Sequence, residues 1–195
     1  MNNIIMNVDM AKATAGHYKT TTRRIIKNSE SIPNILTEVE KLVLIDMVSK
    51  YVVDEILWIR EPAIVTNYIS RFDGAQIDYQ LKSNNKKEYR IDLPKRFFPN
   101  PKKWITKCKS VPNGCISEMA KQKIRITNIR VERLQDIGYD DISLEGFDNT
   151  YKDCSGLSYE ERRFDWWINL WNSTAPEKYQ WEANPYVFVY DFELV

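Results

Sequence analysis

The feature that most constrains this fold is a short helix that ends at Gly16 and the basic, hydroxyl-rich segment behind it. Residues 8–15 have the composition of two helical turns, with Asn7 placed as the N-cap. Gly16 stands where a left-handed residue ends a helix. Residues 20–26 are rich in β-branched side chains and favour a strand. The sequence therefore predicts a helix, a loop and a strand in this order.

That loop brings a possible nucleophile and a possible base together. The hydroxyl of Thr22 becomes a nucleophile only if a neighbouring group removes its proton. Lys19 can accept this proton if its pKa is lowered by burial or by cations such as Arg23 and Arg24. Lys19 and Thr22 lie three residues apart. This spacing points the two side chains to opposite faces of a strand but brings them together on a helical or irregular turn. The alternative interpretation is a solvated basic turn whose threonines satisfy backbone groups.

Hydrophobic patterning predicts the other elements. Strands are expected at 4–5, 54–60 (buried), 123–131 and 186–192 (aromatic). Helices are expected at 35–51, with apolar positions 35, 39, 42, 43 and 47, at 140–145, ended by Gly146, and at 160–171. The polar segment between them predicts a hairpin with a turn at 82–87, followed by irregular structure at 94–101. We therefore expect one domain over 1–195, of mixed α and β structure, with an insertion at about 62–115.

Charge and cysteine usage limit the possible partners. The chain of 195 residues carries 28 basic and 27 acidic residues, so any nucleic-acid binding must come from a local patch. Cys108, Cys115 and Cys154 are an odd set without paired spacing, which suggests reduced thiols. A metal site at Cys108 and Cys115 is disfavoured, because the chain has one histidine, His17, and no C-x-x-C pair. We expect no metal and no cofactor.

Targeting signals give the expected location. The N-terminus has no basic region followed by an apolar run, and no segment is long and apolar enough to span a membrane. The sequence predicts a cytoplasmic protein that does not enter a membrane.

Four segments, taken in order, resemble the ASCH-domain family of the PUA-like superfamily, most closely its phage and prophage members. These segments are Gly16-His17-Tyr18-Lys19-Thr20-Thr21-Thr22-Arg23-Arg24, Glu55-Ile56-Leu57-Trp58-Ile59-Arg60-Glu61, Val131-Glu132-Arg133-Leu134-Gln135-Asp136-Ile137 and Trp181-Glu182-Ala183-Asn184-Pro185-Tyr186-Val187-Phe188-Val189. The chain has one residue more than the family between Gly16 and Lys19, and residues 62–115 match no family segment. The resemblance implies an α+β fold, built as a PUA-like mixed β-barrel with peripheral helices and a central insertion.

The resemblance also implies an activity. Some small ASCH proteins are amidohydrolases that remove the acetyl group of N4-acetylcytidine with a lysine, a threonine and a glutamate. Their counterparts here are Lys19, Thr22 and Glu145, the last in a Glu145-Gly146 pair that matches the end of the family's Ala-x-x-Glu-Gly pattern. In that chemistry the lysine takes the threonine proton, and Arg24 or backbone N–H groups stabilise the oxyanion. For Glu145 the alternative interpretation is a solvated helix end.

Other functions remain open at this level. As a binding module for RNA, DNA or a modified base, the chain would use Lys19, Arg23, Arg24 and Arg60 for phosphates, and Trp58 or Tyr18 for stacking on a base. Glu61 belongs to the same candidate surface. The alternatives are a core role for Trp58, an Arg60–Glu61 structural ion pair and an incidental turn position for His17. A ribonuclease role and a protein-binding role against host defence are further alternatives.

Overall fold

The computed structural model describes residues 2–97, 101–111, 116–147, 156 and 158–195, which form a mixed α and β protein. The described chain divides into two compact units. Unit 1 combines Met1–Lys12 with Leu57–Lys123, and unit 2 combines Ala13–Ile56 with Ile124–Val195. Helix α1 (Val8–Ala15) spans the boundary between them, and Asn7 caps it as expected, because its Oδ1 accepts a hydrogen bond from Met10 N at 2.8 Å.

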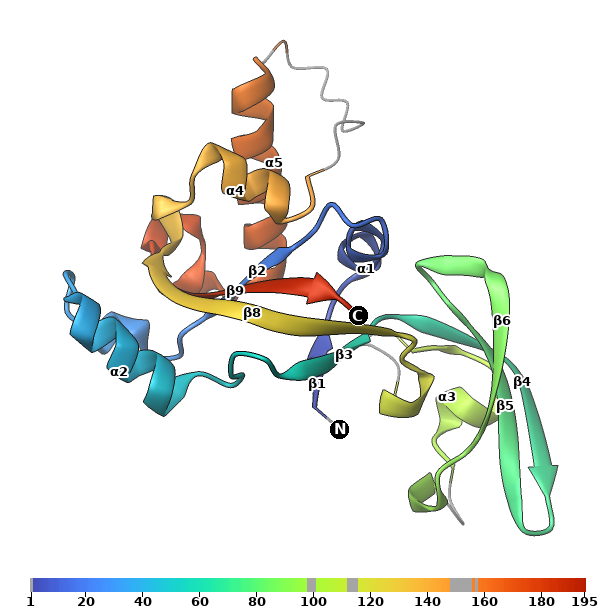
Figure 1. Cartoon of the computed structure of the whole chain (residues 1–195). Coiled ribbons are helices and arrows are strands. Elements are labelled where there is room, and N and C mark those ends of the chain that lie inside the picture. The colour runs from blue at the N-terminus through green and yellow to red at the C-terminus, as the bar shows by residue number, and fades with distance from the viewer. Residues whose placement is uncertain (1, 98–100, 112–115, 148–155, 157) are drawn as a thin grey trace. The chain divides into compact units, whose positions relative to one another are not determined.

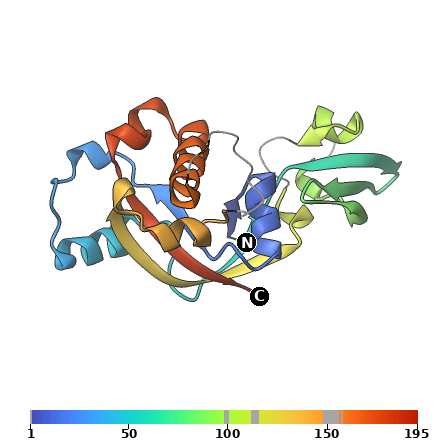
Figure 2. The same ribbon diagram turned by 90° about the horizontal axis from the view of Figure 1, so that it is seen from above.

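Unit 2 is built on three antiparallel strands. Strand β9 (Tyr186–Leu194) pairs with β8 (Gln122–Arg133) on one side and with β2 (Thr21–Ile25) on the other, and Figures 1 and 2 show β8 and β9 running side by side. All residues of β9 from Tyr186 to Tyr190 are buried, which makes it the central strand. The strands expected at 20–26, 123–131 and 186–192 are therefore confirmed.

Two helices cover one face of these strands. Helix α4 (Tyr139–Leu144) and helix α5 (Tyr159–Thr174) pack together, and their core includes Trp167, Trp171 and the β9 residues Val187 and Val189. The expected helices at 140–145 and 160–171 are confirmed. Helix α5 begins at a capping box formed by Ser158 and Glu161, which fixes its first turn.

Helix α2 (Glu38–Val48) is the remaining long helix of unit 2 (Figure 1). It begins later than the expected 35–51, because Thr37 and Glu40 form a capping box. None of its residues is buried. Short 3-10 helices lie at Ser29–Ser31, Lys95–Phe97, Ser117–Met119, Leu134–Asp136, Glu177–Tyr179 and Trp181–Ala183.

Unit 1 holds a parallel strand pair. Strand β1 (Asn3–Ile5) pairs with β3 (Ile56–Arg60), which belongs to unit 1 from Leu57 onward, and Ile4 lies opposite Ile59. The strand expected at 54–60 is confirmed as β3, but its expected burial holds only for alternate residues. Leu57 and Ile59 are buried, whereas Ile56 is exposed and Trp58 is half-buried, because alternate residues of β3 point to opposite faces.

The second sheet of unit 1 has the strand order β6-β5-β4-β7. Its strands are β4 (Ala63–Arg71), β5 (Gly74–Leu81), β6 (Asn84–Asp92) and β7 (Ser110–Val111), and the short helix α3 (Lys103–Thr106) follows β6. The hairpin expected within 62–115 is confirmed, since β5 and β6 are antiparallel and joined by a turn at Lys82 and Ser83. Cys115 and Cys154 lie outside the described residues.

The described strands form open sheets, none of which closes into a barrel. Within the described residues no helix is both long and apolar enough to cross a membrane.

Candidate functional site

The loop after α1 is set by His17 rather than by Gly16. His17 has a φ of 62°, in the left-handed region, whereas the expected left-handed residue was Gly16. Histidine is among the residues that adopt this conformation more often than most. Beyond it, the N–H groups of Tyr18 and Lys19 both donate to Ala13 O at 3.2 Å, which closes the end of the helix and turns Lys19 inward.

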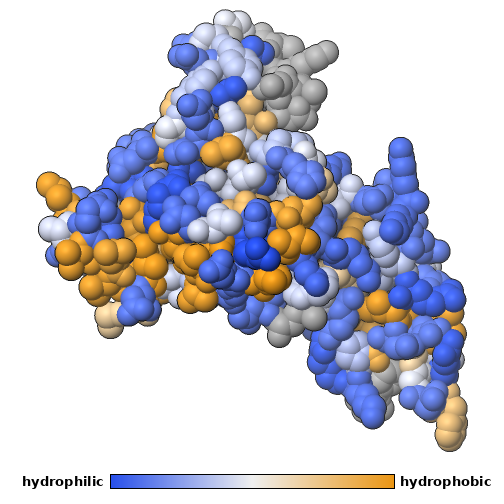
Figure 3. Space-filling view, in the orientation of Figure 1, coloured by the Kyte–Doolittle hydropathy of each residue, from blue (hydrophilic) through white to orange (hydrophobic). Residues whose placement is uncertain are grey.

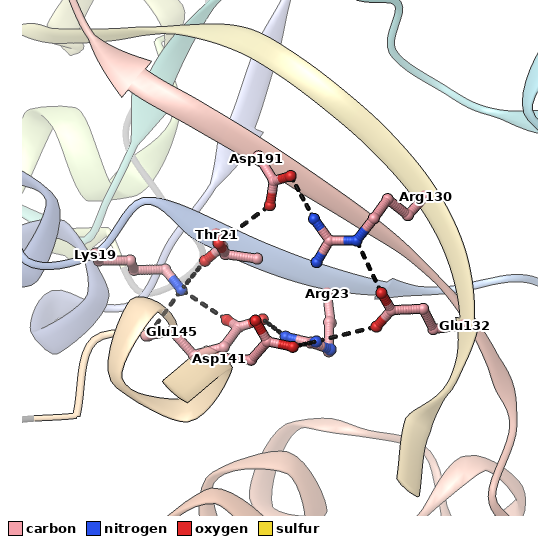
Figure 4. A network of polar contacts seen from close by, with 8 residues as sticks. All are labelled: Lys19, Thr21, Arg23, Arg130, Glu132, Asp141, Glu145 and Asp191. Carbon is pink, nitrogen blue, oxygen red and sulfur yellow. Dashed lines mark hydrogen bonds and ion pairs between the residues drawn. The ribbon is translucent and has the colours of Figure 1, made fainter. Parts of the chain in front are cut away.

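Lys19 is a buried cation with three acceptors. Its Nζ donates to Thr21 O at 2.7 Å, to Glu145 O at 2.8 Å and to Glu145 Oε2 at 2.8 Å (Figure 4). Burial lowers the pKa of Lys19, and the charge and hydrogen bond of Glu145 oppose this shift. The positive charges of Arg24 and Arg23 lower the pKa further. These three contacts use every N–H of the ammonium group.

Glu145 reaches Lys19 from the end of α4. The two residues form an isolated antiparallel bridge, and Thr20 N donates to Leu144 O at 2.9 Å beside it. Gly146 follows with a φ of +100°, and a Cβ at this position would lie 3.0 Å from Ala13 Cβ and 3.3 Å from Lys19 Cβ. The close approach of the two segments therefore requires a glycine after Glu145.

Arg23 joins the same centre from β2. Its Nη1 donates to Glu145 Oε1 at 3.0 Å, and its Nη2 donates to Glu132 Oε2 at 3.1 Å and to Asp141 Oδ2 at 3.2 Å. The guanidinium carbon also lies 5.9 Å from the centre of the Trp167 ring. Because its guanidinium is buried among carboxylates, Arg23 serves the internal network and is not presented to a phosphate as the sequence analysis suggested.

Further charges extend the network along the strands. Arg130 Nε donates to Glu132 Oε1 at 2.8 Å, Arg130 also contacts Asp191, and Thr21 Oγ1 donates to Asp191 Oδ1 at 3.2 Å (Figure 4). Three cations and four carboxylates thus share one connected cluster. Sequence reasoning missed Arg130, Glu132, Asp141 and Asp191 as members. The available signal was the spacing of Arg130 and Glu132, because residues two apart on a strand lie on the same face.

Thr22 and Arg24 lie on the other face of β2. Thr22 is opposite Tyr190 and Arg24 is opposite Phe188 in the register with β9, whereas Thr21 and Arg23 share the face of the charged cluster. Thr22 is buried and Arg24 is half-buried, and burial lowers the pKa of Arg24. The structure thus brings Lys19 and Glu145 into contact. Thr22, three residues after Lys19, points to the face of β2 opposite Thr21 and Arg23.

The candidate binding residues fall in both units. Tyr18 is an exposed residue of unit 2, beside Lys19. Trp58 and Arg60 belong to unit 1. Trp58 packs against a hydrophobic core that includes Ile77, Tyr79 and Leu81, and Lys123 Nζ lies 4.4 Å from its ring centre. Arg60 Nη1 donates to Asn3 Oδ1 at 3.4 Å. The core role that was the alternative for Trp58 is confirmed in part, since its ring is half-buried against that core.

Glu61 is a buried carboxylate of unit 1 that yields a pH prediction. Its Oε2 accepts a hydrogen bond from Ser83 N at 2.9 Å, and burial raises its pKa above 4.5. The folded state therefore binds the proton more tightly than the unfolded state, and the stability that this proton gives is lost as the pH rises above 4.5. We expect Glu61→Gln, which keeps an acceptor for Ser83, to raise the free energy of unfolding at pH 7 and to lose this advantage below pH 4.5.

Urea denaturation of both proteins across this pH range measures the difference. Glu88→Gln on the exposed β6 surface is the matched control and is expected to change little. An equal stability of Glu61→Gln and wild type at every pH contradicts the prediction.

Comparisons of the chain with protein-family models, with characterised proteins and with solved structures returned no match. A buried lysine with a lowered pKa beside a carboxylate is an arrangement suited to proton transfer, because a proton can pass between the two groups over 2.8 Å.

Proposed function

We propose that this protein is an ASCH-type amidohydrolase that removes an acyl group from a nucleobase amine, with N4-acetylcytidine as the model substrate. The observation that carries the proposal is the buried contact of Lys19 and Glu145, two residues 126 positions apart that the family resemblance had paired. A relation to the PUA-like superfamily and a cytoplasmic location in a bacterial or phage-infected cell belong to the same proposal. It requires no metal or cofactor.

The proton of the Lys19–Glu145 pair gives the site its chemistry. Transfer of one proton from Lys19 Nζ to Glu145 Oε2 leaves a neutral amine and a neutral carboxylic acid. The lowered pKa of Lys19 favours the neutral amine. The amine then accepts the proton of the Thr22 hydroxyl as its oxygen attacks the acyl carbonyl.

The second half of the reaction uses the acid. Glu145 protonates the nitrogen of the cytosine as the carbon–nitrogen bond breaks, so the nucleoside leaves as an amine. Arg24 or a loop N–H stabilises the negative oxygen of the tetrahedral intermediate. Water then cleaves the ester on Thr22, releasing acetate and restoring the hydroxyl. The reaction requires that Thr22, on the face of β2 opposite Thr21, reaches Lys19 when substrate is bound.

Hydrolysis of N4-acetylcytidine, followed by the absorbance change on deacetylation, tests the proposal. We expect turnover by the wild type and a loss of about 10²–10⁴-fold in Glu145→Gln, because the amide cannot take and return the proton. A folded wild type without turnover contradicts the proposal, and circular dichroism establishes the fold of each variant.

A binding module without chemistry is the second candidate. It is favoured by the three hydrogen bonds that already satisfy Lys19 and by the orientation of Thr22. In this function the Lys19–Glu145 pair holds the loop in place, and a modified base or an RNA binds beside it with Tyr18 and Arg24. Binding of N4-acetylcytidine or RNA by a protein that does not hydrolyse the nucleoside distinguishes this candidate, and a steep salt dependence indicates the RNA.

A further inference from the structure

Helix α2 is apolar on the side that faces solvent as well as on the side that faces the domain. Lys41, Leu44 and Ile45 are half-buried and mark the inner side. The opposite side carries Val39 and Met47, which are 69% and 77% exposed. The exposed side of a surface helix normally carries charged and polar residues. The exposed side of α2 is therefore a surface that lacks its cover in the isolated chain.

The exposed apolar surface extends beyond the helix. Nine large aliphatic residues between positions 35 and 56 each have 46% or more of their surface exposed, and we call them the α2 patch: Ile35, Val39, Leu42, Val43, Met47, Val48, Val52, Val53 and Ile56. Figure 3 shows an orange, apolar area over α2 and the segment that follows it. All nine belong to unit 2.

The area of the patch matches one side of a stable dimer. At roughly 100 Å² of exposed surface each, nine such side chains present on the order of 900 Å², more than the roughly 300–600 Å² of the largest patch on a typical monomer. A standard protein interface takes about 800 Å² from each partner. The nine side chains together thus expose about as much apolar surface as one side of such an interface.

The pattern of the patch is complementary to itself. Val39, Val43 and Met47 are spaced by four residues, so they form one stripe along α2 that is symmetric about Val43. In an antiparallel pair of helices related by a two-fold axis, Val43 meets its own copy and Val39 meets the Met47 of the partner helix. Glu40 and Asp46 stand beside the stripe, where they remain in water at the rim.

We propose that the chain forms a homodimer in which α2 packs antiparallel against α2 of a second copy, with the two-fold axis at Val43. The stripes of Val39, Val43 and Met47 from the two copies then cover each other. A membrane surface is a poorer occupant, because the helix carries Glu38, Glu40 and Asp46 against one lysine, whereas helices that lie on membranes have basic polar faces. The proposal is independent of the catalytic one.

Analytical ultracentrifugation of the wild type and of Val43→Glu tests the dimer. We expect a wild-type dimer and an increase of about 100-fold or more in the dissociation constant of Val43→Glu, because two carboxylates would meet at the axis without a partner. Val43 is 48% exposed, so the monomer is expected to stay folded, which circular dichroism checks. Phe72→Glu, at a fully exposed turn of unit 1, is the matched control and is expected to remain dimeric.

Disulfide trapping gives a second, independent readout. Val43→Cys places two thiols at the axis, and mild oxidation is expected to produce a covalent dimer that the wild type, with its native cysteines alone, does not form. A monomeric wild type overturns the proposal, whether or not it binds anionic vesicles. A wild-type dimer that Val43→Glu leaves intact overturns it as well, since the interface must then lie elsewhere.

Discussion

Replacing Glu145 with alanine is expected to lower the free energy of unfolding by about 3–5 kcal/mol, the usual cost of removing one partner from a buried ion pair. The cost is large because the side chain serves two cations at once, Lys19 at 2.8 Å and Arg23 at 3.0 Å. Both cations are buried, so neither can turn to water when the carboxylate is removed. Urea denaturation with a constant m-value measures the loss.

The matched control is Glu193→Ala on β9. Glu193 also pairs with an arginine, Arg125 at 3.1 Å, but both side chains are largely exposed. An exposed pair contributes about 0–1 kcal/mol, so this variant is expected to stay close to wild type. Equal losses for Glu145→Ala and Glu193→Ala contradict the buried, doubly paired position of Glu145.

Replacing Thr22 with alanine is expected to reduce kcat for N4-acetylcytidine by at least ~10³-fold while the Kd for the nucleoside changes little. The hydroxyl is the proposed nucleophile, and it forms its bond to substrate only as the reaction proceeds. The loss therefore falls on the chemical step and not on binding. Fixed-time assays of hydrolysis measure kcat, and equilibrium dialysis of the nucleoside measures Kd.

Thr21 provides the matched control within the same strand. It has the same side chain and is also buried, but it points to the opposite face of β2 and its Oγ1 donates to Asp191 at 3.2 Å. Thr21→Ala is expected to lose about 1 kcal/mol of stability with the hydrogen bond and to retain turnover. A loss of turnover in Thr21→Ala with full activity in Thr22→Ala would assign the nucleophile to the other face.

The elements with strong local signals could be predicted from the sequence. Asn7 as a cap, Gly146 as a stop and the aromatic run of β9 each specify their structure within a few residues. The left-handed residue at the end of α1 was placed one position early, because glycine is the usual choice there and the hydrogen bonds of Tyr18 and Lys19 to Ala13 select His17. The exposure of α2 could not be predicted, since the same apolar period is typical of a helix in the core.

The candidate site was predictable in part. Lys19 and Glu145 were paired through the resemblance to a family and lie in contact in the structure. Asp141, Arg130 and Asp191 were not found, because their meeting depends on the register of β8 with β9 and on the packing of α4. Thr22 was expected beside Lys19 on a turn, but β2 already begins at Thr21, and the alternation of a strand decides the direction of each side chain.

The coupling energy between Lys19 and Glu145 tests the account most directly, because both proposed functions rest on their contact. A double-mutant cycle of wild type, Lys19→Met, Glu145→Gln and the double variant, each measured by urea denaturation, gives this energy. We expect a coupling of about 2–3 kcal/mol for a buried pair at this distance. If the stability losses of the two single variants sum to the loss of the double variant within about 0.5 kcal/mol, the two side chains do not meet. This result would contradict the site.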